Sequence, residues 1–132
     1  MKIIERDRLI IRQSMNLPFN NTEIWGEELD ALSVYTDVVK EKFLKDMEII
    51  KKQSSPSLIA VHLNETLVDS ELVELIVTEL VKAGKSVRKV VFVGLDKQTE
   101  KMFKAMIKKR NAEYSFYFID DYEKGKQWLT GK

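Results

Sequence analysis

Two short apolar runs on either side of a helical pattern are the most regular part of the chain. Residues 58–63 and 87–93 are mostly aliphatic or β-branched and are bounded by polar residues, as is typical of strands buried on both faces. Gly84 lies just before the second run, where it predicts a left-handed cap that ends the intervening helix. That helix has apolar residues at three- and four-residue spacing along one face: Val73, Ile76, Val77, Leu80 and Val81. Strand, helix and strand with short loops predict a right-handed parallel crossover.

A longer amphipathic helix is predicted upstream, beginning at Ser33 or Thr36. Pro56 marks its end, because proline cannot continue a helix and disfavours helical geometry at Ser55. Charged residues occupy its other faces, and one face carries the apolar series Tyr35, Val39, Phe43, Met47 and Ile50.

Two more helices and a strand are predicted downstream. Asp96 is a good N-cap for a helix whose inward side carries Phe103, Met106 and Ile107. Residues 115–119 (SFYFI) predict a further strand.

The last helix is short and contains a glycine. Asp120 and Glu123 have the spacing of a capping box, and the helix should end near residues 128–129. Gly125 falls on the same helix face as Trp128 and Leu129, so we expect it to face the sheet or a neighbouring helix.

The N-terminal third is less regular. Residues 2–14 predict extended chain with enough β-branched content near residues 9–11 for a strand, and residues 16–21 predict a loop from their turn-forming residues. Residues 22–32 are compatible with a strand or with a short helix, and the strand is favoured. Trp25 is expected in the core, because large rings usually supply packing area.

The alternation of strands and helices predicts an α/β fold. Its 132 residues suffice for one domain, spanning residues 1–132, with a mainly parallel mixed sheet and about four packed helices.

Composition narrows the function classes. The chain is 44% hydrophobic and 33% charged, as in ordinary globular proteins, and its formal charge of +1 predicts no general attraction to nucleic acid or anionic membranes. It has no cysteine, which excludes thiolate metal sites and disulfides and is compatible with a reducing compartment. No segment is long and apolar enough for a membrane span, and the charged N-terminus does not resemble a signal peptide. A cytoplasmic monomer or small homo-oligomer is therefore expected.

The chemistry-bearing residues give no enzyme motif. His62 is the only histidine, has no clustered acid or thiol in the sequence, and shares its side of the strand with Leu58 and Ala60, so a structural role is expected. Residues 83–86 look like the end of a phosphate-binding loop, but Glu79 stands where a glycine is required and the segment follows a helix. No catalytic residue, metal site or cofactor is predicted.

Two loops lie where open α/β sheets bind ligands. Residues 67–70 and 94–97 each follow a predicted parallel strand and precede a helix, and helix N-termini favour anions. Ordinary helix capping explains both loops equally well.

Several segments carry a resemblance to one family. VHLNETLVDSELVELIVTELVKAG resembles the core of the STAS domain, the fold of bacterial anti-sigma-factor antagonists. VVFVGLDKQTEKMFKAMI and FYFIDDYEKGKQWL are similar to the following elements, especially in the SpoIIAA-like branch, and residues 26–30 (GEELD) are similar to the family's Gly-Glu-Leu-Asp with one extra residue. The likeness covers about residues 24–129. It implies a non-enzymatic module of transcription regulation that binds another protein, such as an anti-sigma factor or kinase-like regulator.

The phosphorylation motif of that family is altered here. The family has Asp-Ser-Ser/Thr-Gly and is phosphorylated on the second hydroxyl residue, whereas this chain has Asp69, Ser70, Glu71 and Leu72. A carboxylate carries one fixed charge and cannot be switched, while a phosphate brings about −1.5 to −2. Switching by phosphorylation is therefore not expected at Glu71, and Ser70 is the candidate for a displaced phosphoacceptor.

The resemblance also suggests where a partner binds. Leu75 points away from the buried face of its helix and is expected to be exposed, and four lysines four, three and four residues apart form a basic stripe on the next helix. A solvated face is the usual explanation for such a stripe, and an interface is the alternative. The predicted partner-binding residues are Asp69, Ser70, Glu71, Leu75, Lys97 and Lys101.

Two other function classes remain open. A small-ligand or lipid carrier would have a pocket between the long helix and the sheet, lined by Tyr35, Phe43 and Met47, although the same residues serve equally as core. An enzyme that holds phosphate at two helix N-termini is the more remote alternative.

Overall fold

A computed structural model, which describes residues 11–131, shows a five-stranded sheet with the strands in sequence order. The strands are β1 (Met15–Phe19), β2 (Thr22–Glu28), β3 (Ser57–His62), β4 (Val87–Val93) and β5 (Ser115–Ile119). β1 is antiparallel to β2, and every other neighbouring pair is parallel. The predicted α/β fold with a mainly parallel mixed sheet is confirmed.

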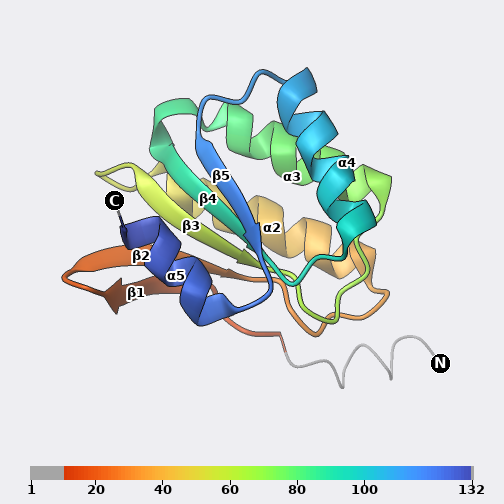
Figure 1. The fold of residues 1–132 in the computed structure, drawn as a ribbon, viewed down its shortest axis with the longest axis horizontal. Coiled ribbons are helices and arrows are strands. Elements are labelled where there is room, and N and C mark those ends of the chain that lie inside the picture. The colour runs from red at the N-terminus through yellow and green to blue at the C-terminus, as the bar shows by residue number, and fades with distance from the viewer. Residues whose placement is uncertain (1–10, 132) are drawn as a thin grey trace.

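Helices cover both faces of this sheet (Figure 1). The connecting helices are α2 (Thr36–Lys51), α3 (Ser70–Lys82) and α4 (Lys97–Lys109), and a 3-10 turn, η1 (Gly84–Ser86), follows α3. Successive right-handed crossovers step in the same direction across the sheet, so they place these three helices on one face. α5 (Tyr122–Thr130) follows the last strand and packs on the opposite face.

Alternation along the strands divides the core in two. Ile59, Val61 and Phe92 face the three connecting helices in the larger cluster, while Ala60 and Val91 face α5 in the smaller one. The central strands β3 and β4 are therefore buried on both sides, as their continuous apolar runs predict.

The helix boundaries follow local chemistry. Asp69 and Asp96 cap α3 and α4 by accepting hydrogen bonds from the backbone N–H groups of Leu72 (2.9 Å) and Thr99 (2.7 Å). Gly84 has φ +55° just after α3, which is the left-handed conformation predicted for it.

Two local predictions were wrong. Residues 16–21 are not a loop: residues 16–19 belong to β1, and only Asn20 and Asn21 form the turn, with φ of +49° and +64°. Pro18 is tolerated because β1 is an edge strand. The cap of α5 is Asp121 and not Asp120, since the Asp121 carboxylate accepts from the Lys124 N–H at 3.2 Å.

The N-terminal strand predicted near residues 9–11 falls almost entirely outside the described residues, and residues 11–14 form no helix or strand. Within residues 11–131, no helix has the length and apolar character needed to cross a membrane.

Candidate functional site

The carboxyl ends of the parallel strands bring the predicted site residues to one edge of the molecule. β3 and β4 end at this edge, and α3 and α4 begin there side by side (Figure 1). Both loops singled out in the sequence, residues 67–70 and 94–97, lie at this edge.

The start of α3 presents a hydroxyl and a carboxylate to solvent. Ser70 is the first residue of the helix and is exposed, while the Asp69 carboxylate is engaged in capping. Glu71 is also exposed and forms an ion pair with Lys40 of α2 at 2.9 Å. The hydrogen bond from Lys40 to Glu71 raises the pKa of the Lys40 ammonium. Glu71 is thus a charged group already paired with a lysine.

Two exposed aliphatic side chains lie on the segments that lead into α2 and α3, the helices that carry this charged pair. Val34 is 64% exposed and Leu67 is 51% exposed. Their segments are joined by a hydrogen bond from the Leu67 N–H to the Ser33 carbonyl at 2.7 Å and by a β-bridge between Ser33 and Thr66. The sequence analysis did not single out Val34, because only the folded chain places it next to the loop that precedes α3.

Leu75 is not exposed, contrary to the prediction. It is half-buried and packs against the larger core cluster, because α3 lies between α2 and α4 and its flank is covered on both sides. Arg110 of α4 reaches the same flank and pairs with Glu74 at 2.7 Å.

The lysines of α4 are exposed as predicted. Lys97 and Lys101 are exposed to solvent, as are Lys104 and Lys108 further along the helix. Lys97 lies 4.0 Å from Glu100, and Lys104 lies over the Phe118 ring.

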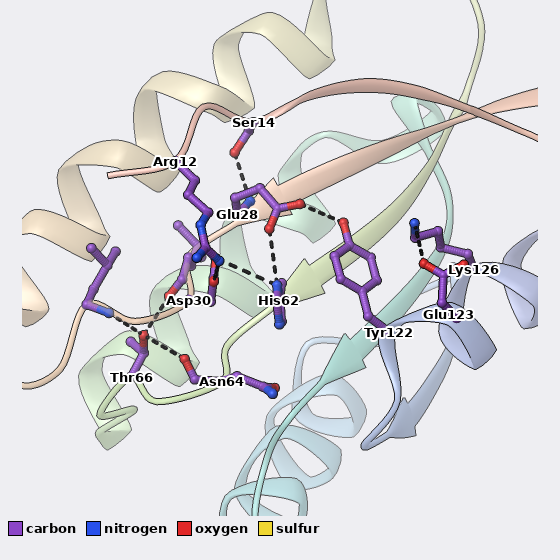
Figure 2. Close-up of polar contacts among 12 residues, drawn as sticks. Arg12, Ser14, Glu28, Asp30, His62, Asn64, Thr66, Tyr122, Glu123 and Lys126 are labelled. Atoms are coloured by element: carbon purple, nitrogen blue, oxygen red, sulfur yellow. Dashed lines mark hydrogen bonds and ion pairs between the residues drawn. The ribbon is translucent and has the colours of Figure 1, made fainter. Parts of the chain in front are cut away.

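A polar cluster that the sequence analysis missed lies beside α5, on the face of the sheet opposite to α2, α3 and α4 (Figure 2). Glu28 and His62 are register partners on β2 and β3, and Asp30, two residues after Glu28, follows on the same side. His62 Nδ1 lies 3.1 Å from Glu28 Oε1 and 3.6 Å from Asp30 Oδ1. The prediction that His62 has no acidic partner is therefore wrong, because the fold supplies two.

Tyr122 closes one side of this cluster. Its hydroxyl donates to Glu28 Oε2 at 2.7 Å, and its ring lies against His62 with centroids 4.6 Å apart. Gly26 makes this possible, because a Cβ there would lie 2.7 Å from the tyrosine hydroxyl. Burial alone would raise the pKa of Glu28, but the hydrogen bonds from His62 and Tyr122 outweigh it and lower that pKa.

Arg12 closes the other side. Its guanidinium forms an ion pair with Asp30 Oδ2, while Asp30 Oδ1 is buried and has no hydrogen-bond partner among residues 11–131. A histidine between two carboxylates is a set of groups that can hold a cation or pass a proton.

The residues proposed to line a carrier pocket are mostly core. Phe43 and Met47 are fully buried in the larger cluster, and Tyr35 is half-buried beside it. A surface cavity of about 610 Å³ lies instead at the opposite end of the strands, where residues 53–58 meet Trp25 and Arg88.

Comparisons with models of known protein families, with curated proteins and with solved structures found no match to this chain.

Proposed function

We propose that this chain is a STAS-like, non-enzymatic regulatory module of the cytoplasm that binds another protein through the edge where α3 begins. We call this surface the α3 edge and define it by Val34, Leu67, Ser70 and Glu71. The observation that carries the proposal is a pair of exposed aliphatic residues on the hydrogen-bonded segments that lead into α2 and α3, together with an exposed hydroxyl and carboxylate at the start of α3.

Apolar side chains flanked by charges are typical of interfaces, whose centres are less charged than their rims. Val34 and Leu67 would supply the centre, and Glu71 with Lys40 would form part of the rim. Lys97 and Lys101 extend the same side of the molecule along α4 and suit a partner with an acidic surface. An anti-sigma factor or a kinase-like regulator is the class of partner that the resemblance suggests.

The charge at Glu71 bears on regulation. A carboxylate, unlike a phosphate, cannot be added or removed by a kinase or phosphatase, so this position would keep one state where the resembled family alternates between two. Ser70 is exposed at the N-terminus of α3, where a phosphate would be stabilised by the helix dipole, so phosphorylation there would add the switch that position 71 lacks. Mass spectrometry of the protein isolated from its own cells tests this, and unmodified Ser70 under all growth conditions would contradict it.

The partner proposal is tested by capture with matched leucine variants. Leu67→Asp alters the α3 edge, and Leu44→Asp alters a leucine of α2 that is similarly exposed, at 42%. The protein and both variants would be used to capture partners from the cytoplasm of the source cell, followed by affinity measurements with the purified partner. We expect Leu67→Asp to weaken binding at least tenfold, about 1.4 kcal/mol or more, as for a central interface residue. Leu44→Asp should bind normally, and equal binding by both variants would contradict the proposal.

A further inference from the structure

Glu28, Asp30 and His62 bring three metal-ligand side chains to one point. One ligand atom from each can be chosen so that all three lie within 4.8 Å of one another. This convergence follows from the sheet, because Glu28 and His62 pair across β2 and β3 and Asp30 continues the same side of β2.

The two distances from the imidazole to the carboxylates are close to those of a first-row metal site. Zinc ligands lie about 2.0–2.1 Å from the ion, so neighbouring ligand atoms of a tetrahedral site are about 3.3–3.4 Å apart. His62 Nδ1 lies 3.1 Å from Glu28 Oε1 and 3.6 Å from Asp30 Oδ1, on either side of that value. The imidazole nitrogen is therefore already near the spacing that a zinc ion needs from each carboxylate, and the three ligand atoms lie within 4.8 Å of one another.

One ligand atom is buried without a partner. Asp30 is only 5% exposed, and its Oδ1 accepts no hydrogen bond from the part of the chain that the structure describes, although it faces His62. A buried carboxylate oxygen without a donor costs free energy, and a bound cation would remove that cost.

We propose that Glu28 Oε1, Asp30 Oδ1 and His62 Nδ1 bind a divalent first-row transition metal, with Zn²⁺ as the best fit. Imidazole nitrogen with carboxylate oxygens suits zinc and its neighbours in the series, whereas Mg²⁺ and Ca²⁺ prefer oxygen alone. This inference is independent of the protein-binding role proposed for the α3 edge.

Two neighbouring side chains affect how tightly this site would bind a metal. Tyr122 donates to Glu28 Oε2, so it orients the carboxylate while leaving Oε1 for the metal. Arg12 pairs with Asp30 and is 55% exposed, so its guanidinium supplies a positive charge that competes with the metal and can move away into solvent. The carboxylates of Glu28 and Asp30 together with the Arg12 guanidinium carry a net charge of −1. Without Arg12 the two carboxylates carry −2.

The test uses untagged full-length protein that has been treated with chelator and dialysed. Zn²⁺ affinity is measured by competition with a chromogenic chelator, Co²⁺ absorption reports coordination geometry, and Mg²⁺ serves as the comparison ion. We expect one Zn²⁺ per chain and a tetrahedral Co²⁺ spectrum. His62→Gln should abolish the spectrum and weaken Zn²⁺ binding by more than the roughly 10- to 100-fold that loss of an outer partner costs.

Three further variants separate the metal site from an ordinary hydrogen-bonded cluster. Tyr122→Phe should weaken Zn²⁺ binding about tenfold, and Arg12→Gln should strengthen it by removing the competing charge. Glu113 is an exposed carboxylate far from these three residues in the sequence, and Glu113→Gln should leave the Zn²⁺ affinity unchanged. Circular dichroism of the metal-free variants verifies that each is folded. Absence of Zn²⁺ binding in the unaltered protein, or equal affinity in His62→Gln, would overturn the proposal.

Discussion

Gly125 of α5 packs directly on the sheet. A methyl group at this position would lie 3.3 Å from Ile119 Cγ2 and 3.4 Å from both Val91 Cγ1 and Val93 Cγ2. The prediction that the glycine faces the sheet is confirmed, and its close approach explains why a short helix keeps a residue of low helix propensity.

Gly125→Ala is expected to change stability little. The alanine methyl needs a few tenths of an ångström of adjustment, and the helix gains about 1 kcal/mol of propensity in return. Gly125→Leu should cost on the order of 1–3 kcal/mol through overpacking. Urea unfolding measures both, with Lys124→Leu on the exposed face of α5 as the control. If Gly125→Leu were as stable as the unaltered protein, α5 would not pack on the sheet through Gly125.

Glu27 of β2 is a fully buried carboxyl that points to the face of the sheet opposite to Glu28. Its Oε1 accepts a hydrogen bond from Trp25 Nε1 at 2.8 Å. Burial, and then the neighbouring carboxyl of Asp46, raise the pKa of Glu27 well above its ordinary value. Burial would also raise the pKa of Asp46, but its hydrogen bonds with Glu27 and Lys42 lower it. The pair therefore holds its proton on Glu27.

The raised pKa of Glu27 makes stability fall as pH rises. The folded state binds more protons than the unfolded state between the unfolded pKa, about 4.3, and the raised folded pKa, so stability is lost across that window. Glu27→Gln cannot ionise and keeps an oxygen for Trp25. We expect it to be more stable than the unaltered protein at pH 8, on the order of 1 kcal/mol, with the difference shrinking towards pH 4. Urea unfolding at several pH values checks this, with exposed Glu23→Gln of the same strand as control. A pH-independent difference would contradict the assignment of the proton.

At the scale of elements, the β1–β2 hairpin shows how a local pattern can mislead. Asparagine and proline in residues 16–21 are typical of loops, yet only Asn20 and Asn21 turn, both in the left-handed conformation that a two-residue hairpin needs. The strand signal of β1 is weak because its side chains are largely exposed and little hydrophobic alternation is required.

The exposed basic stripe of α4, Lys97, Lys101, Lys104 and Lys108, should steer an acidic partner. Replacing Lys101 and Lys104 with glutamine is expected to slow association with the captured partner about two- to tenfold at low salt, because long-range attraction raises encounter rates. Stopped-flow kinetics at several salt concentrations measure this, with Lys45→Gln and Lys52→Gln, exposed lysines of the α2 region, as control. An association rate that does not change between low and moderate salt would remove the stripe from the interface.

At the scale of the whole molecule, protection from hydrogen exchange should follow position in the sheet. β3 and β4 are paired on both sides and covered on both faces, whereas β1 and β5 are edge strands with partly exposed side chains. Amide exchange followed by mass spectrometry should therefore be slowest in β3 and β4 and faster in β1 and β5. Equal protection of β1 and β3 would mean that the β1 edge is covered in solution.

Of the predicted site, the start of α3 and the lysines of α4 are where the pattern placed them. Asp69 caps α3, and Ser70 and Glu71 are exposed, because capping and helical facing depend on a few neighbouring residues. Leu75 was misjudged because its burial depends on two other helices. The partners of His62 could not be predicted, because they depend on the pairing of β2 with β3, 34 residues apart along the chain.

Downstream of residue 33, the sequence alone determined the order of strands and helices and the main buried face of each helix, and with them the α/β class, because periodicity and capping act over a few residues. Only the tertiary structure decided which residues meet across strands. It placed Glu28 opposite His62, Tyr122 over Gly26, and Val34 beside the loop before α3. Strand register and helix packing join residues far apart in the chain, and no local spacing records those contacts.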